Sequence, residues 1–374
     1  MPGVPLFDTV TPLAPLRDEL REAALRVLDS RRYILGPEVE AFEQEFAAYC
    51  GCSHAVGVAN GTDAITIALR AMGVGPGDEV VVPSFTFYAS VEAIPVTGAT
   101  PVFCDVDPHT YCVTPEAVKA VLTPRTKAVI AVHLFGNLAP VAEIEQLGVP
   151  VLEDAAQAAG ARSASGRPGA LGAAATFSFF PSKNLGAFGD AGMITTSDGD
   201  IAEAARTLRF HGSHDKVSYE MIGYNSRLDE LQAALLRVQL PHLDAWADGR
   251  RRAGGHYEQA GLGELVALPQ TTAGTDPAWH LYVVGHPDIE TIRESLAGAD
   301  IGCRAYYRTP VHLQPPMRQW AGDAELPGTE QAAREHLAIP MSPVLDREQV
   351  ARVVAAVRAA SVTPPRLAAR SEAP

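Results

Sequence analysis

The sequence predicts an α/β fold built on a largely parallel sheet of seven strands, with helices on both faces. Along the first two-thirds of the chain, short apolar runs alternate with segments whose apolar residues recur about every 3.6 positions. Several runs are continuous and β-branched, such as Val80-Val81-Val82, which is typical of strands covered on both faces. The candidate strands are residues 55–59, 79–83, 101–104, 127–133, 150–153, 176–180 and 192–195.

Helix-length segments separate most of these strands, and glycines stand where three of the helices should end. The segments are residues 63–71, 88–97, 115–122 and 140–147, and the glycines are Gly73, Gly98 and Gly148. The last two strands are joined only by residues 183–191, which is short for a parallel crossover connection. We therefore expect one strand of this pair to run antiparallel.

The chain is long enough for two domains, and its pattern changes near residue 254. We expect a large domain over residues 1–250 and a smaller α+β domain over residues 251–362. The tail, residues 363–374, is rich in Pro, Arg and Ala, and we expect it to be disordered. Further helices are expected at residues 15–30, 37–50, 227–247, 289–298 and 347–361, and further strands at 278–286 and 303–307.

Charge and composition exclude several classes of protein. The formal net charge is −14 and no basic cluster occurs that could bind a phosphate backbone, so no nucleic-acid partner is expected. The five cysteines form no CxxC pair, which indicates free thiols in a reducing compartment. The N-terminus lacks the pattern of a secretory signal, and no apolar run approaches the ~20 residues that cross a bilayer. We therefore expect a cytoplasmic protein that does not associate with a membrane.

A single lysine, Lys183, lies in a nearly uncharged stretch between an apolar strand and a glycine-rich turn. A lysine in such surroundings loses its proton easily and can attack a carbonyl as a neutral amine. Upstream, Asp154 ends a buried strand and can hold a fixed negative charge against a protonated ring nitrogen. Together they indicate pyridoxal 5'-phosphate (PLP) chemistry, in which Lys183 binds the cofactor aldehyde and shuttles protons. Taken alone, Lys183 would be a surface lysine and Asp154 a helix N-cap.

Other polar and aromatic residues follow the strand ends, and open α/β sheets bind ligands at that edge. Asn60-Gly61-Thr62-Asp63 opens a helix directly after a strand, so its amides and hydroxyl could bind a phosphate, although simple N-capping is commoner. Ser178 is preferred over Ser182 as a further phosphate ligand. Gln157 could bind a ring hydroxyl or be an exposed helix residue, and Phe87 could stack on a ring or pack in the core.

Several other catalytic motifs are absent. Gly73-Val74-Gly75-Pro76-Gly77 does not match GxGxxG and follows a helix instead of a strand, which argues against an oxidoreductase with a dinucleotide site. No P-loop, HExxH or GxSxG motif occurs, so neither a metal site nor a serine hydrolase is expected.

Many stretches of the chain match one family in the same order, between about residue 33 and residue 312. They include residues 34–39, 60–64, 75–80, 83–87, 153–158, 178–184, 189–190 and 223–229. On these stretches the chain resembles the DegT/DnrJ/EryC1/StrS sugar aminotransferases, a branch of the fold-type I (aspartate aminotransferase-like) enzymes. The resemblance implies a large domain with a seven-stranded, mostly parallel sheet and a smaller α+β C-terminal domain.

The resemblance also implies roles for individual residues. Lys183 matches the family's Schiff-base lysine, Asp154 the partner of the pyridinium nitrogen, Gln157 the residue beside the ring hydroxyl and Phe87 the stacking aromatic residue. Phosphate-binding positions are matched by Gly61, Thr62, Asp63 and Ser178, and by Asn225, which in the family reaches the cofactor of the other subunit. The last role makes a homodimer part of the active site. Tyr306 and His312 lie in a segment that lines the substrate space, where they could contact the sugar nucleotide or pack within the small domain.

The family transfers an amino group from glutamate, or sometimes glutamine, to a keto group on a nucleotide-linked sugar. Because Lys183 is intact, transamination is favoured over the dehydration that some relatives perform. We therefore expect a PLP-dependent aminotransferase acting on a deoxy sugar linked to dTDP or UDP. Two alternatives stay open, an aminotransferase for keto-cyclitols and a PLP-binding regulator that no longer catalyses.

Overall fold

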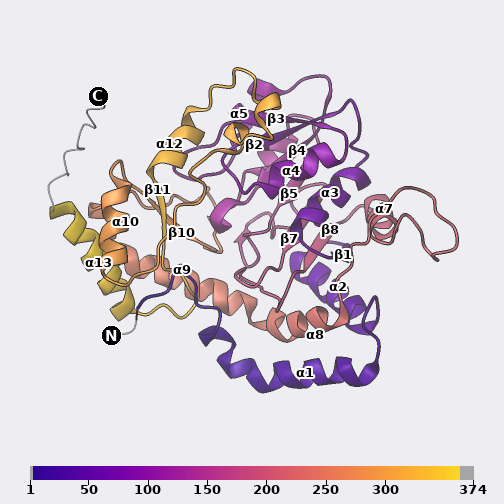
Figure 1. Cartoon of the computed structure of the whole chain (residues 1–374), viewed down its shortest axis with the longest axis horizontal. Helices are drawn as coiled ribbons and strands as arrows, with labels where there is room; N and C mark the ends of the chain where they lie inside the picture. The colour runs from indigo at the N-terminus through magenta and orange to yellow at the C-terminus, as the bar shows by residue number, and fades with distance from the viewer. Residues whose placement is uncertain (1–2, 363–374) are drawn as a thin grey trace, which may run out of the picture.

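The structure of the protein is a computed structural model, and it describes residues 3–362. A seven-stranded sheet forms the centre of the larger part of the molecule (Figure 1). The strands lie in the order β1 (His54–Val58), β8 (Gly192–Thr196), β7 (Ala174–Ser178), β5 (Val151–Asp154), β4 (Thr126–Val132), β2 (Glu79–Pro83) and β3 (Thr100–Cys104). All seven predicted strands are therefore present.

Six of the seven strands share one direction, and β8 is the exception. It pairs antiparallel with both of its neighbours, β1 and β7, whereas the pairs from β7 to β3 are parallel. This confirms that one strand of the closely connected pair β7–β8 runs antiparallel. The short turn can return the chain beside the strand it has just left, but it cannot carry the chain back across the sheet.

Both faces of the sheet are covered by helices. Val80 and Val82 of β2 lie in one apolar cluster and Val81 between them lies in another, and all three are fully buried. Since successive side chains of a strand point to opposite faces, each face is packed against its own layer. The helices of this part are α2 (Pro37–Cys50), α3 (Gly61–Ala71), α4 (Ala89–Val96), α5 (Pro115–Val121), α6 (Val141–Glu145) and α7 (Gly199–Arg209).

The long helix predicted at residues 227–247 is wrong as a single element. The chain forms α8 (Glu230–Gln239), a 3-10 turn (Leu240–His242) and α9 (Leu243–Gln259). Pro241 within the turn has no amide hydrogen to continue the α-helical bonding, so the α-helix is interrupted there. Figure 1 shows α1 (Arg17–Ser30) beneath α8, while α9 leads towards the C-terminal elements. The expected boundary at residue 250 falls inside α9.

The C-terminal elements have an apolar cluster of their own, between α9, α10 (Ile289–Gly298), α13 (Arg347–Val362) and a small sheet. Two antiparallel strands, β10 (Tyr282–Gly285) and β11 (His336–Ile339), form this sheet. The strand predicted at residues 303–307 is wrong, because only Arg304 makes a bridge, to Ala338 of β11. Residues 363–374, predicted as a disordered tail, lie outside the described residues. The remaining elements are β6 (Arg162–Ser163), β9 (Thr275–Asp276), α11 (Arg318–Ala321) and α12 (Pro327–Glu335).

A buried carboxylate joins two of the helices that support the sheet. Glu230, at the start of α8, is 1% exposed and accepts hydrogen bonds from the backbone amides of Gly36, Glu38 and Val39 at 2.8, 3.0 and 2.9 Å. These amides belong to the first turn of α2, where an α-helix has no acceptors of its own. The negative charge also suits the positive end of the helix dipole.

Replacing Glu230 by alanine should therefore lower the free energy of unfolding by about 2–4 kcal/mol, since three amides lose a charged acceptor. Glu230→Gln keeps an oxygen acceptor and should lose less. Thermal and urea unfolding measure the change, with Glu22→Ala on the exposed face of α1 as the matched control. Equal stability of the Glu230→Ala and Glu22→Ala proteins would contradict this account.

Candidate active site

A cavity of about 540 Å³ opens at the edge of the sheet where the parallel strands end. Asp154 and Ser178 are the last residues of β5 and β7, and Asn60 lies two residues beyond the end of β1. Parallel strands bring their carboxyl ends to one edge, so segments far apart in sequence meet there. Of the predicted site residues, the cavity is lined by Gly61, Thr62, Phe87, Asp154, Gln157, Ser178, Lys183 and Tyr306.

Lys183 extends from the turn between β7 and β8. The turn is closed by backbone hydrogen bonds from Lys183 to Phe180 (2.8 Å) and from Ala187 to Phe179 (2.7 Å). Burial lowers the pKa of the Lys183 ammonium from its usual 10.5 to about 8, and the negative charge of Asp154 opposes this shift. Lys183 and Asp154 form no ion pair within the described residues, so the amine is not held by the carboxylate.

Both oxygens of the Asp154 carboxylate accept hydrogen bonds. The Ser90 hydroxyl donates to Oδ2 at 2.7 Å, and the backbone amide of Ala156 donates to Oδ1 at 3.1 Å. Asp154 is 5% exposed and lies at the floor of the cavity. The carboxylate therefore has one orientation, fixed by the chain on either side of it.

The start of α3 forms a cradle at another wall of the cavity. The side chain of Asn60 caps the helix by accepting from the Asp63 amide at 2.8 Å, and this leaves the amides of Gly61 and Thr62 without an acceptor among the described residues. A β-carbon at Gly61 would lie 2.8 Å from Cβ of Ser178, so only glycine allows this close approach. Free amides, a positive helix end and hydroxyls suit a phosphate.

Aromatic and amide side chains form the remaining walls. The Gln157 carbonyl oxygen accepts from the Phe135 amide at 2.6 Å, and its amide nitrogen donates to the Tyr307 hydroxyl at 3.2 Å. Phe87 is 54% exposed, and its ring centroid lies 5.9 Å from that of Tyr307. Tyr306 lies beneath the guanidinium of Arg304, which is 5.1 Å from its ring centroid.

The structure does not bring three of the predicted residues into this cavity. Asp63 lies on a neighbouring hollow beside Tyr224. Asn225 pairs with Arg227 at the base of a protruding loop.

The third of these residues, His312, is 4% exposed and lies outside the cavity. Its ring nitrogen Nδ1 is hydrogen-bonded to the Ser84 hydroxyl at 2.6 Å, while its own backbone amide donates to the same oxygen at 3.2 Å. Its ring centroid lies 5.9 Å from that of Phe103. This geometry fits the packing alternative for His312 and not a contact with substrate.

Other residues line the cavity without having been predicted, among them Ser90, His280 and Phe7, whereas Tyr307 belongs to the segment that the resemblance placed there. Ser90 follows the matching stretch 83–87 closely, so its position after a strand end could have suggested it. Phe7 could not have been found in this way, since only the three-dimensional fold brings the N-terminal segment to the site. Its ring stacks on His280 with centroids 5.7 Å apart.

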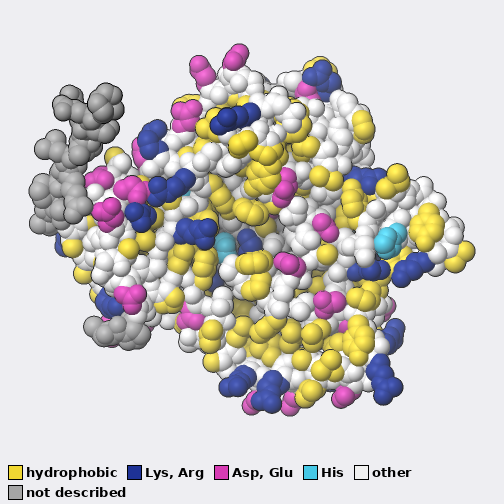
Figure 2. All heavy atoms as spheres, viewed as in Figure 1, with side chains coloured by type: hydrophobic (Ala, Val, Ile, Leu, Met, Phe, Trp, Pro, Cys, Tyr) yellow, Lys and Arg dark blue, Asp and Glu magenta, His cyan; other side chains and the backbone are white. Residues whose placement is uncertain are grey.

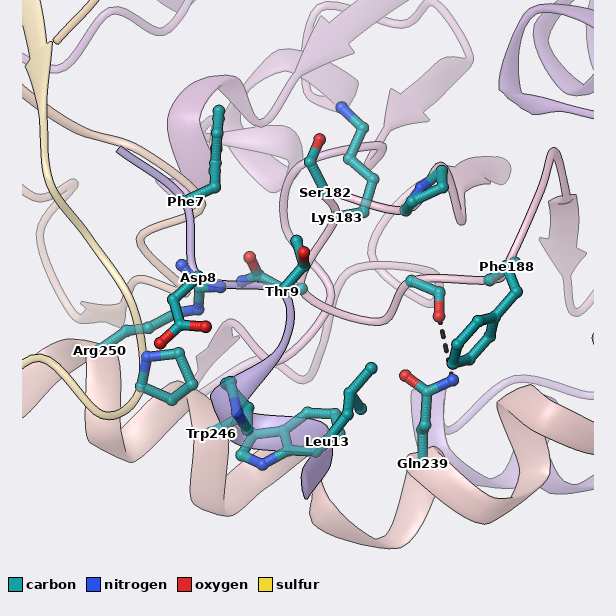
Figure 3. Close-up of a pocket in the computed structure, with 16 residues that line it drawn as sticks. Phe7, Asp8, Thr9, Leu13, Ser182, Lys183, Phe188, Gln239, Trp246 and Arg250 are labelled. Atoms are coloured by element: carbon teal, nitrogen blue, oxygen red, sulfur yellow. Dashed lines mark hydrogen bonds between the residues drawn. The ribbon is translucent and has the colours of Figure 1, made fainter. Parts of the chain in front are cut away.

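A second hollow, of about 320 Å³, lies behind the turn that carries Lys183. Figure 3 shows Trp246 and Arg250 closing it from α9, with Asp8 and Thr9 of the N-terminal segment above them. The amine of Lys183 points away from these residues (Figure 3). The reactive end of the lysine thus belongs to the larger cavity.

The fold and the opposed lysine and carboxylate define a fold-type I aminotransferase. Residues 15–358 match the DegT/DnrJ/EryC1/StrS aminotransferase family, and the chain belongs to it. A dTDP-3-amino-3,4,6-trideoxy-alpha-D-glucose transaminase from Streptomyces venezuelae is 48% identical over 369 residues, which cover 96% of each chain. A UDP-N-acetyl-3-dehydro-alpha-D-glucosamine 3-aminotransferase from Acidithiobacillus ferrooxidans is 43% identical over 360 residues, covering 95% of this chain and 97% of that protein.

Solved structures agree with this assignment. The crystal structure of DesV from S. venezuelae superimposes with a TM-score of 0.93 at 45% identity, covering 97% of this chain and 100% of that one. NtdA from Bacillus subtilis, solved with bound cofactor PMP, has a TM-score of 0.87 at 25% identity, with coverage of 96% and 85%. The cofactor of this family is PLP, with PMP as its aminated form.

The residues of the cavity fit this cofactor. A phosphate suits the cradle at Gly61, Thr62 and Ser178, and a cationic ring nitrogen suits Asp154. Because Lys183 and Asp154 face the same space without pairing, a ring can lie between them.

The lowered pKa of Lys183 leads to a test on the apoprotein. With a pKa of about 8, about a tenth of the amine is neutral at pH 7, against roughly one in three thousand for an ordinary lysine. The initial rate of PLP attachment, followed by absorbance, should rise about tenfold from pH 7 to pH 9 as the ammonium loses its proton. A rate that is still rising steeply above pH 9.5 would mean that the pKa of Lys183 is not lowered.

Proposed function

We propose that the protein is a homodimeric PLP-dependent aminotransferase that moves an amino group from glutamate, or glutamine, to a keto group of a deoxy sugar linked to dTDP or UDP. The observation that carries the proposal is the cavity in which a lysine of lowered pKa faces a fixed carboxylate. The sugar nucleotide rests on the names of relatives that align over nearly the whole chain.

The predicted residues that line the cavity have distinct roles in this proposed reaction. Bound PLP would supply an electron sink for the carbanion that forms when a substrate carbon loses its proton. Lys183 would hold the cofactor through Nζ and, once released, would move a proton between the substrate carbon and the cofactor carbon that carries the amino group. Asp154 would hold the ring nitrogen in its charged form, Gln157 would orient the ring hydroxyl, and Gly61, Thr62 and Ser178 would hold the phosphate.

The substrates enter the same cavity in turn. Glutamate delivers its amino group and leaves as 2-oxoglutarate, after which the keto sugar accepts the amino group. Arg304 and Tyr306, which come from the C-terminal part of the chain, form a wall of the cavity that is the proposed surface for the sugar nucleotide. The guanidinium of Arg304 suits the negative charge of a diphosphate.

Exposed apolar side chains support the homodimer. The loop between α7 and α8 protrudes from the molecule (Figure 1), and Val217 and Ile222 on it are 84% and 85% exposed. In the space-filling view hydrophobic side chains recur on this protrusion and form a broad band near α1 and α8 (Figure 2). Apolar surface of this extent marks an interface. Asn225 lies in the same loop, so a second copy would place it near the partner's phosphate site.

The free cysteines are the reason for proposing that the protein is cytoplasmic. All five are free thiols, and none is paired in a disulfide. This suits the reducing conditions of the cytoplasm. No helix in residues 3–362 combines the length and the apolar character needed to cross a membrane.

Replacing Lys183 by alanine should abolish turnover and covalent cofactor attachment, because among the described residues no other lysine lines the cavity. Borohydride reduction followed by peptide mass mapping identifies the attached residue. Lys127→Ala, at an exposed lysine on β4, is the matched control and should keep both properties. Attachment that survives in Lys183→Ala would overturn the assignment.

The wild-type protein distinguishes an enzyme from a PLP-binding regulator. Mixed with glutamate alone, an aminotransferase should release one 2-oxoglutarate per subunit and convert its cofactor to PMP. A panel of dTDP- and UDP-keto sugars, with a keto-inositol beside them, should then restore PLP for the true acceptor class only. Release of no 2-oxoglutarate from either glutamate or glutamine would contradict the proposed function.

The dimer can be tested through the protruding loop. The wild-type protein should sediment at twice the mass of one chain, and Val217→Asp combined with Ile222→Asp should shift it towards the monomer, since buried charges oppose association. Leu25→Asp with Leu28→Asp on α1 gives a comparison at a second exposed apolar surface. A monomeric wild-type protein with full activity would rule out a shared active site.

A further inference from the structure

Two hydroxyl groups form a chain of hydrogen bonds that ends at the carboxylate of Asp154. The Ser90 hydroxyl donates to Oδ2 of Asp154 at 2.7 Å, and the Thr86 hydroxyl lies 2.9 Å from the Ser90 oxygen. Thr86 and Ser90 are each 1% exposed, and both line the cavity. Neither residue was assigned a role by its position in the sequence.

The direction of the chain of hydrogen bonds follows from the donors available. An ionised carboxylate only accepts, so the single proton of the Ser90 hydroxyl is used on Asp154. The bond between Ser90 and Thr86 must then use the proton of Thr86. The order is therefore Thr86 to Ser90 to Oδ2 of Asp154, while the Ala156 amide holds Oδ1 at 3.1 Å.

The backbone gives this arrangement little freedom. Thr86 lies in the segment that leads from β2 into α4, and Ser90 lies in the first turn of α4. The Ser90 amide also donates to the Phe87 carbonyl at 3.1 Å, which fixes the first turn beside the cavity. The two hydroxyls thus connect the start of α4 with the end of β5, on neighbouring parts of the sheet edge.

We propose that Ser90, supported by Thr86, is a positioning residue that holds the Asp154 carboxylate in the orientation that receives the cofactor ring nitrogen. The proposal rests on the proposed function, since it needs a ring nitrogen opposite Asp154. Hydrogen bonds in a chain polarise one another, so the terminal bond to the carboxylate is stronger than a bond from Ser90 alone. A carboxylate fixed in advance loses no rotational freedom when the cofactor binds.

The first experiment compares Ser90→Ala with Ser90→Thr. Alanine removes the donor, and a charge-assisted hydrogen bond of this kind corresponds to a loss of about ten- to hundredfold in PLP affinity. Threonine keeps the hydroxyl and should recover most of the affinity. The readouts are the Kd of PLP for the apoprotein, from fluorescence quenching, and the pH midpoint of the bound cofactor's absorbance, which should move only in the alanine variant.

Ser342→Ala is the matched control for loss of a buried hydroxyl, since Ser342 is 4% exposed and lies away from the cavity. It should leave both the Kd and the pH midpoint unchanged. Thr86→Val should weaken PLP binding less than Ser90→Ala does, because it removes only the support for the donor. A Thr86→Val effect larger than that of Ser90→Ala would contradict the stated order of the hydrogen bonds.

A double-mutant cycle decides whether Ser90 acts through Asp154. With Asp154→Ala as the background, adding Ser90→Ala should change the Kd of PLP less than twofold, because the carboxylate it positions is gone. If the two losses multiply, Ser90 acts independently and the proposal is overturned. Unchanged affinity in Ser90→Ala alone, in a protein that still binds PLP at Lys183, would refute this inference and leave the proposed function standing.

Discussion

Lys183 and Asp154 share one cavity without forming an ion pair, and the chemistry of the site depends on this separation. A direct pair would hold the amine as an ammonium ion and remove its nucleophilic character. Burial instead favours the neutral amine, and Asp154, although close enough to oppose that shift, does not cancel it. The carboxylate remains free to meet a positive charge on the far side of a ligand. A planar cofactor that is electrophilic at one end and basic at the other satisfies both residues at once.

The separation is set by the sheet. Asp154 ends β5 and Lys183 follows β7, and these strands are parallel neighbours whose ends meet at one edge. The antiparallel return of β8 keeps the lysine turn short and close to that edge. Gly61 and Gly192 permit close approaches at this edge, since a β-carbon at Gly192 would lie 2.4 Å from the Asn60 carbonyl carbon. The phosphate cradle therefore lies against the same strands that carry the two charges.

Local patterns in the sequence were enough to predict the seven strands and the convergence of Lys183 and Asp154. Apolar runs and strand-end polar residues are short-range features, and parallel topology brings them together by rule. The prediction of a single helix over residues 227–247 was wrong, because it followed the apolar spacing and did not allow for Pro241. His312 was matched to a substrate-lining segment, but its partner Ser84 is 228 residues away. Contacts of that range, like those of Phe7 and Tyr307, are fixed by tertiary packing and leave no periodic pattern.

The cavity lies between the carboxyl edge of the large sheet and a wall from the C-terminal part of the chain. Leu281, Val283 and Val311 from that part lie in the same apolar cluster as the strands of the large sheet. Tyr307 adds a polar link through its hydrogen bond with Gln157. The wall is therefore held in place against the cofactor site by both apolar and polar contacts. On the proposed function, Arg304 and Tyr306 are the part of this wall that would discriminate between sugar acceptors, since neither is hydrogen-bonded to Lys183 or Asp154.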